Sequence, residues 1–181
     1  NALEVKDAID VLAGRTQGDL LEISLLLGSH MLVLAEKAKT LPEARAMLEN
    51  ALSSGVGLRK LAEMIAAQGG DPRVVEDLSL LPQAAVKRVM RAETAGYLSA
   101  MDTTALGMAA QRMGAGRAKK SDMLDYSVGY VLHVRLGDEV TEDTLLLTGM
   151  VNCQCVRTCE MLDVPCVIFV RSKEPLADAL A

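Results

Sequence analysis

The sequence predicts an α+β protein in which a helical segment precedes a unit of strands packed with one helix. Two observations support this class. In the first part of the sequence, apolar residues recur every three to four positions, which is helical spacing. Residues 96–147 instead combine short apolar runs, tight-turn residues and a single helical pattern. The turn-rich connection Gly69–Pro82 separates the two parts, so we predict domains over 1–82 and 83–147 and a tail over 148–181.

Two helices are predicted first. One covers 2–13 and ends at Gly14, because glycine readily adopts the conformation that terminates a helix. The other covers 19–39. Asp19 and Glu22 have the spacing of a capping box, in which a side chain accepts a hydrogen bond from a free N–H of the first turn.

The predicted helix 19–39 carries apolar residues around nearly its whole circumference. Such a helix needs neighbours on every side, so we expect it to be buried. Gly28 lies in its middle, where glycine costs about 1 kcal/mol relative to alanine, and this predicts a close helix crossing. If part of the cover is missing, the exposed apolar side should make the protein self-associate.

Two further helices follow. Thr40, Pro42 and Glu43 form a start signal, with a capping hydroxyl, a proline in the first turn and a glutamate at the third position. The amphipathic helix that they open is predicted to end before Gly55, and a fourth helix covers 58–67.

The C-terminal unit should begin with a strand over 96–101. Asp102 then offers a side-chain oxygen to the first N–H groups of a helix, which Gly114 and Gly116 end. The apolar run 128–134 follows and is predicted to be a strand.

A tight-turn signal, Gly137-Asp138, lies between the apolar runs 128–134 and 145–147 and predicts a hairpin. The turn resembles the hammerhead turn of biotinyl and lipoyl carrier domains, which need a lysine at an exposed hairpin tip. The only lysine after this turn is Lys173, and its surroundings have no hairpin symmetry. The turn is therefore interpreted as architecture.

Charge and composition argue against two classes of function. The net charge is −5 and the isoelectric point is near 5.1, without the basic clustering of a nucleic-acid surface. No run of about 18 apolar residues predicts a membrane span, and no signal peptide is evident, so we expect a cytoplasmic protein. The sequence opens at Asn1, which with Glu4 already has helix-start spacing, and we expect a fragment of a longer chain.

Three groups of residues could carry chemistry, and a structural role is favoured for each. Ser29 and His30 include a nucleophile and a base, but adjacent helix positions point about 100° apart, so the two side chains should not face each other. His133 lies in a predicted strand and is interpreted in the same way. Gly114–Arg117 resembles a phosphate loop, yet its glycines close a helix instead of opening one, which favours a helix stop.

The four cysteines all lie between Cys153 and Cys166. Their spacing is not the paired arrangement of common zinc sites, and disulfides are not expected in a reducing cytoplasm. Three interpretations stay open: a metal site, structural thiols, or a tail of foreign or misread sequence.

Five ordered segments carry a family resemblance: NALEVKDAI (1–9), LGSHM (27–31), AAQGGD (66–71), GAGR (114–117) and DYSVG (125–129). Together they resemble the C-terminal half of the thymidine and pyrimidine-nucleoside phosphorylases, in the family's order and at its approximate spacing. The resemblance covers about 1–147. The tail beyond it does not resemble the family.

The resemblance implies a reversible phosphorolysis, in which inorganic phosphate displaces the base of a pyrimidine nucleoside and gives free pyrimidine and a pentose 1-phosphate. It implies no organic cofactor, and a homodimer for the full-length enzyme. It also refines the fold class, to α+β with an N-terminal helical segment followed by a C-terminal α/β-hammerhead domain. The alternative is a non-catalytic helical and hammerhead module that binds a partner or acts as a carrier.

One site residue follows from the resemblance. The family's phosphate loop and its pyrimidine-holding residues belong to the N-terminal half, so no residue here is assigned as catalytic or substrate-binding. Asp7 aligns with a glutamate that in some members helps to hold a structural potassium ion. The chain alone is expected to be inactive.

Overall fold

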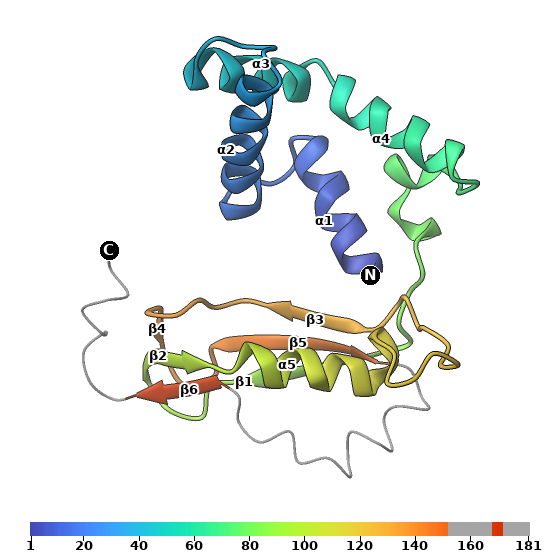
Figure 1. Cartoon of the computed structure of the whole chain (residues 1–181). Coiled ribbons are helices and arrows are strands. Elements are labelled where there is room, and N and C mark those ends of the chain that lie inside the picture. Colours follow the sequence, from blue (N-terminus) through green and yellow to red (C-terminus); the bar gives the residue numbers. More distant parts are fainter. Residues whose placement is uncertain (152–167, 172–181) are drawn as a thin grey trace. The chain divides into compact units, whose positions relative to one another are not determined.

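The computed structural model describes residues 1–151 and 168–171, which belong to two compact units (Figure 1). One unit is Glu4–Leu81, and the other combines Asn1–Leu3 with the chain from Pro82 onward. Helices form the first unit, and antiparallel strands with one further helix dominate the second. The predicted α+β class is therefore confirmed.

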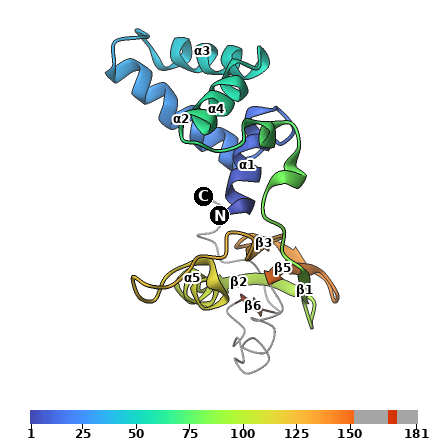
Figure 2. The ribbon, with the colours of Figure 1, turned by 90° about the vertical axis from the view of Figure 1, so that its right-hand side faces the viewer.

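In the helical unit, the third helix packs against the second and against the fourth (Figure 2). Two 3₁₀ turns complete this unit, and in each of them an aspartate side chain accepts a hydrogen bond from a backbone N–H of the turn. The elements are α1 (Ala2–Leu12), α2 (Asp19–Leu34), α3 (Leu41–Ser53), α4 (Val56–Ala67), η1 (Pro72–Val75) and η2 (Leu78–Leu80).

The start of α2 differs from the predicted capping box. Gly18 occupies the N-cap position with φ 123°, and no side chain caps the helix. The Glu22 carboxylate instead accepts hydrogen bonds from Arg45 Nη2 of α3, at 3.0 Å to each oxygen. The prediction of a capping box formed by Asp19 and Glu22 was therefore wrong, because the Glu22 side chain forms an ion pair with Arg45 of α3 instead.

The predicted end of α2 at Lys39 was also wrong, since the helix stops at Leu34 and Glu36 takes a left-handed φ of 56°. The expected burial on all sides holds for one face only. Leu25 is 5% exposed on that face, whereas Leu34 on the other face is 84% exposed. The helix thus has a packed side and an exposed apolar side.

Gly28 confirms the predicted close crossing of α2 with α3. A Cβ atom at this position would lie 2.8 Å from Leu48 Cδ1, so only glycine allows the present approach of the two helices without a shift. The cost of glycine in a helix interior is offset here by contact between helices.

The start signal of α3 is confirmed. Thr40 Oγ1 accepts a hydrogen bond from Glu43 N at 3.3 Å, and Glu43 Oε2 accepts one from Lys39 N at 2.9 Å. Helix α4 follows directly and begins at Val56, two positions before the predicted 58, because Gly55 turns the chain with φ 70°.

Two three-stranded sheets form the second unit, and all their strand pairs are antiparallel. One sheet has the order β1-β5-β3, and the other has the order β4-β2-β6. The strands are β1 (Val86–Arg91), β2 (Gly96–Met101), β3 (Gly129–Leu132), β4 (Glu139–Val140), β5 (Leu145–Val151) and β6 (Ile168–Arg171).

The strand-to-helix step in this unit is confirmed. Strand β2 has the predicted bounds, and Asp102 Oδ1 accepts a hydrogen bond from Ala105 N at 2.9 Å. Helix α5 (Thr103–Ala110) continues into a π-helical turn, Gln111–Ala115, in which Gly114 has φ 107°. That glycine ends the helical segment as predicted.

The predicted hairpin is only partly correct. Strands β3 and β5 do pair, with Leu132 opposite Leu147. The chain between them, however, crosses to the other sheet, where Val140 of β4 pairs with Gly96 of β2. Gly137 donates a backbone hydrogen bond to Leu98 O at 2.9 Å, so the turn links the sheets and does not simply reverse the chain.

The apolar core of this unit joins the two sheets and α5. Leu98 and Val140 are each 1% exposed, and Leu106 contributes from α5. Together these contacts fix α5 against the strands, which positions the loop that follows it. The buried cluster consists of Ala92, Leu98, Leu106, Val134, Val140, Leu146 and Leu147.

Candidate functional site

Asp7, the predicted potassium ligand, lies in the middle of α1 with an exposed side chain. A carboxylate oxygen is a suitable donor for a hard cation, which prefers several oxygen ligands. Within the described residues, no group of three or more His, Cys, Asp or Glu side chains could hold a metal ion. Asp7 can therefore serve as one ligand among others, and its assignment stays a prediction.

A buried carboxylate on the same helix, which pairs with two partly exposed basic side chains, was missed by the sequence analysis. Asp10 is 6% exposed, and its carboxylate accepts hydrogen bonds from Lys6 Nζ at 2.5 Å and from Arg15 Nη1 at 3.1 Å. The hydrogen bond from Lys6 lowers the pKa of Asp10 most, with Arg15 acting in the same direction and burial opposing both. The four-residue spacing of Lys6 and Asp10 was the available signal.

The loop between α5 and β3, residues 116–128, is held by its own carboxylates. Asp122 Oδ2 accepts hydrogen bonds from Ala118 N at 3.1 Å and Lys119 N at 3.0 Å. Asp125 Oδ1 accepts hydrogen bonds from Ser127 N at 3.0 Å and Ser127 Oγ at 2.6 Å. Two backbone N–H groups directly after the glycine segment 114–117 are thus already bound, and the segment itself ends a helix, which agrees with its interpretation as a helix stop.

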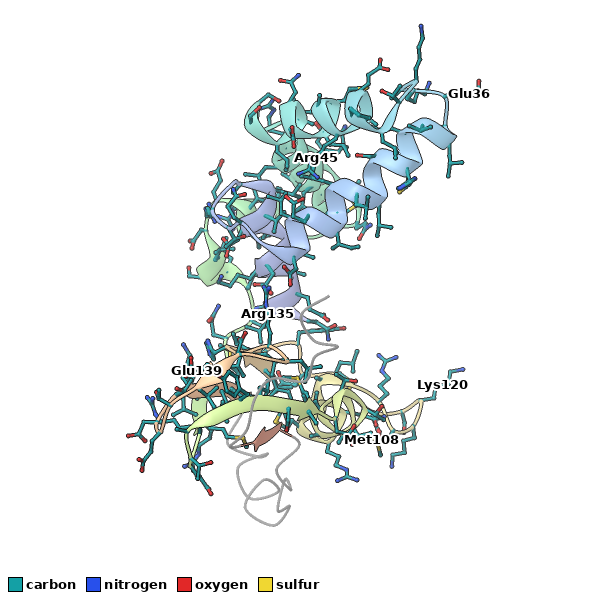
Figure 3. The ribbon with its side chains drawn as sticks, turned by 90° about the vertical axis from the view of Figure 1, so that its left-hand side faces the viewer. Glu36, Arg45, Met108, Lys120, Arg135 and Glu139 are labelled. Atoms are coloured by element: carbon teal, nitrogen blue, oxygen red, sulfur yellow. The ribbon has the colours of Figure 1, made fainter. Side chains whose placement is uncertain are left out.

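The same loop contacts the first residues of the chain. Ala2 N donates a hydrogen bond to Tyr126 O at 2.9 Å, and Leu3 Cδ1 lies 3.1 Å from the position that a Cβ atom of Gly129 would occupy. Ala2 and Leu3, which belong to the strand unit, therefore contact the loop and β3. The basic side chain of Lys120 projects away from the loop (Figure 3).

Ser29 and His30 do not form a nucleophile–base pair. Ser29 is 3% exposed and its Oγ donates to Leu25 O at 2.6 Å, whereas His30 is exposed. The prediction that the two side chains point apart is confirmed. His133 follows β3 with an exposed side chain, and its Nε2 lies 2.9 Å from Thr148 Oγ1 of β5.

No lysine in the described part of the strand unit occupies the tip of a hairpin. Lys87 lies in β1, and Lys119 and Lys120 lie in the 116–128 loop. Lys173 and the cysteine segment 153–166 fall outside the described residues.

The fold defines a class: an α+β chain with a helical unit followed by a unit of two small antiparallel sheets. Comparison with known proteins narrows this class. Residues 97–148 match the family model described as pyrimidine nucleoside phosphorylase C-terminal domain.

Curated relatives extend the similarity over most of the chain. A pyrimidine-nucleoside phosphorylase of Geobacillus stearothermophilus is 49% identical over 148 residues, which is 82% of this chain and 34% of the relative. The Bacillus subtilis (strain 168) enzyme is 47% identical over 152 residues, covering 84% and 35% of the two chains. The Staphylococcus aureus (strain USA300) enzyme is 45% identical over 156 residues, covering 86% and 36%.

The chain belongs to the pyrimidine-nucleoside phosphorylase family. It spans about a third of the length of the curated relatives that it matches. Among the described residues, no helix is both long and apolar enough to cross a membrane.

Proposed function

We propose that this chain supplies the C-terminal part of a pyrimidine-nucleoside phosphorylase, a pentosyltransferase that exchanges the base of a pyrimidine nucleoside for inorganic phosphate. The observation that carries the proposal is the 49% identity to such an enzyme over 82% of the chain. A cytoplasmic location and a homodimer of the full-length enzyme belong to the same proposal.

The chemistry explains why we assign this chain a supporting role. Phosphorolysis requires a phosphate held in line with the sugar carbon and donors that stabilise charge on the departing base. The glycine segment 114–117 ends a helix, and the backbone N–H groups of Ala118 and Lys119 are bound by Asp122. These groups are therefore proposed to shape the unit that completes the enzyme, and not to hold phosphate.

A chimeric enzyme tests this function. The matching segment of the Geobacillus stearothermophilus relative would be replaced by the corresponding residues of this chain. We expect phosphorolysis of thymidine or uridine within about tenfold of the parent rate, because the exchanged part positions the catalytic residues and does not supply them. Liquid chromatography of the released base gives the rate, and the parent enzyme is the control. A folded chimera that releases no base would contradict the proposal.

We also propose that Asp7 provides one oxygen of a potassium site in the complete enzyme. The support is its family alignment and its exposed carboxylate on α1. In the chimera, the melting temperature should be higher in potassium chloride than in sodium chloride, and Asp7→Asn should remove the difference. Glu76→Gln, which alters another exposed carboxylate, should leave it in place. An unchanged difference in Asp7→Asn would refute the assignment.

A further inference from the structure

Met123 is an apolar side chain that lies almost wholly in solvent. Methionine usually fills gaps in a core or belongs to an apolar surface, because its thioether side chain is flexible. Met123 is instead 89% exposed, the largest exposed fraction among the methionines that the structure describes. Met31 follows with 68%, and Met113 has only 5% of its surface exposed. Packing therefore does not account for Met123 in this chain.

The loop between α5 and β3 holds Met123 in this position. Asp122 precedes it and accepts two backbone hydrogen bonds of the loop, and Asp125 follows it and donates a backbone hydrogen bond to Gly114 O at 2.9 Å. The direct neighbours of Met123, Asp122 and Leu124, are only partly exposed. A backbone that is held on both sides thus presents a single thioether sulfur to solvent.

A thioether in solvent reacts with hydroperoxides. The sulfur lone pair attacks one peroxide oxygen, the O–O bond breaks as the S–O bond forms, and the second oxygen leaves as hydroxide. The hydroxide takes the proton of the new S–OH group and becomes water. The sulfur is thereby oxidised to a sulfoxide and the peroxide is reduced. We propose that Met123 is the principal site of methionine sulfoxide formation by hydroperoxides among the described residues of this chain.

Met113 shows why the fold, and not methionine as such, selects the site. It lies in the turn that ends α5 and forms a buried cluster with Val128, which is 0% exposed. A peroxide cannot reach this sulfur unless the cluster opens, and a sulfoxide there would place a polar group in an apolar core. This inference rests on the strand unit alone and is independent of the proposed function.

Mass spectrometry of the oxidised chain tests the proposal. The whole chain would be treated with hydrogen peroxide at neutral pH, quenched and digested with trypsin, which leaves Met123, Met113 and Met31 on the separate peptides 121–135, 113–117 and 16–37. Met123 should gain one oxygen atom at least about tenfold faster than Met113, in line with exposed fractions of 89% and 5%, and ahead of Met31. Equal rates for Met123 and Met113, or faster oxidation of Met31, would overturn the proposal.

Two controls separate the fold from the local sequence. In urea, where the chain is unfolded, peptides 121–135 and 113–117 should gain oxygen at similar rates, and a preference for Met123 that persists there would contradict selection by the fold. Met123→Leu should remove the oxygen from peptide 121–135 and leave the rate at Met31 unchanged. Oxygen that still appears on peptide 121–135 of this variant would place the modification on another residue. Circular dichroism checks that the variant melts within about 2 °C of wild type, as expected for an exposed position.

Discussion

Asp10 joins the C-terminal half of α1 to the residues that follow the helix. The Asp10 carboxylate receives hydrogen bonds from Lys6, one turn earlier, and from Arg15 beyond the helix end. Its side chain is almost completely buried, whereas Lys6 and Arg15 stay about half exposed. The two basic groups thus keep their hydration while they compensate the buried charge, which favours a net stabilising pair.

We predict that Asp10→Asn lowers the free energy of unfolding by about 1–2 kcal/mol at pH 7, through loss of charge-assisted hydrogen bonds. Because the folded state lowers the pKa of Asp10, this stabilisation is present above its unfolded pKa and is lost as the pH falls through the lower, folded value. The gap between wild type and variant should therefore narrow below about pH 4.

Urea unfolding at neutral and acidic pH measures both effects. Glu63→Gln is a matched control, because it removes the carboxylate of an exposed pair with Lys60 that contributes little. An Asp10→Asn variant as stable as wild type at pH 7 would show that the pair does not stabilise the fold.

The side chain of Asp102 caps the N-terminus of α5, the helix of the strand unit. Asp102 is the one residue between β2 and α5, and its side chain accepts a hydrogen bond from the otherwise unpaired N–H of Ala105. The strand is therefore joined to the helix without a longer turn. Leu106 then enters the core, with 8% of its surface exposed. The orientation of α5 depends on this cap.

We predict that Asp102→Ala destabilises the protein by about 1 kcal/mol, the usual cost of a lost N-cap. Asp102→Ser keeps a capping oxygen and should cost only a few tenths of that. Thermal unfolding followed by circular dichroism compares the two variants. If both lose the same stability, the negative charge rather than the cap contributes the energy.

Elements with their own local signals could be predicted, and elements that depend on distant partners could not. Strand β2 carries turn and cap signals in its own sequence, and its predicted bounds are those observed. Strand β1 was missed because half of its residues are charged, and it forms by pairing with β5, far along the chain. Strand β6 was missed because the tail was interpreted as unrelated sequence, yet it pairs with β2.

The exposed side of α2 shows what the spacing of apolar residues cannot predict for a single helix. Apolar residues all round this helix predicted burial on every side, because the pattern cannot tell which face a neighbour covers. Gly28 identified the face that packs on α3. On the opposite face, Leu27 and Leu34 are exposed.

At the scale of the whole chain, the family is established, whereas the one site residue is a proposal. Short ordered segments were sufficient to indicate the family, which the relatives then established. Asp7 could be proposed only by resemblance, since one exposed carboxylate has no local signal for a potassium ion. The ion pair of Asp10 was not found, because burial of a carboxylate cannot be seen in sequence.

The most direct test of this account is a phosphorolysis assay of the 181-residue chain by itself. The chain would be incubated with thymidine and inorganic phosphate, and released thymine would be measured by liquid chromatography. We predict no release above the enzyme-free rate, because the residues that hold phosphate and base are expected to lie outside this chain. Clear turnover that depends on phosphate would contradict the account and would place the active site within these residues.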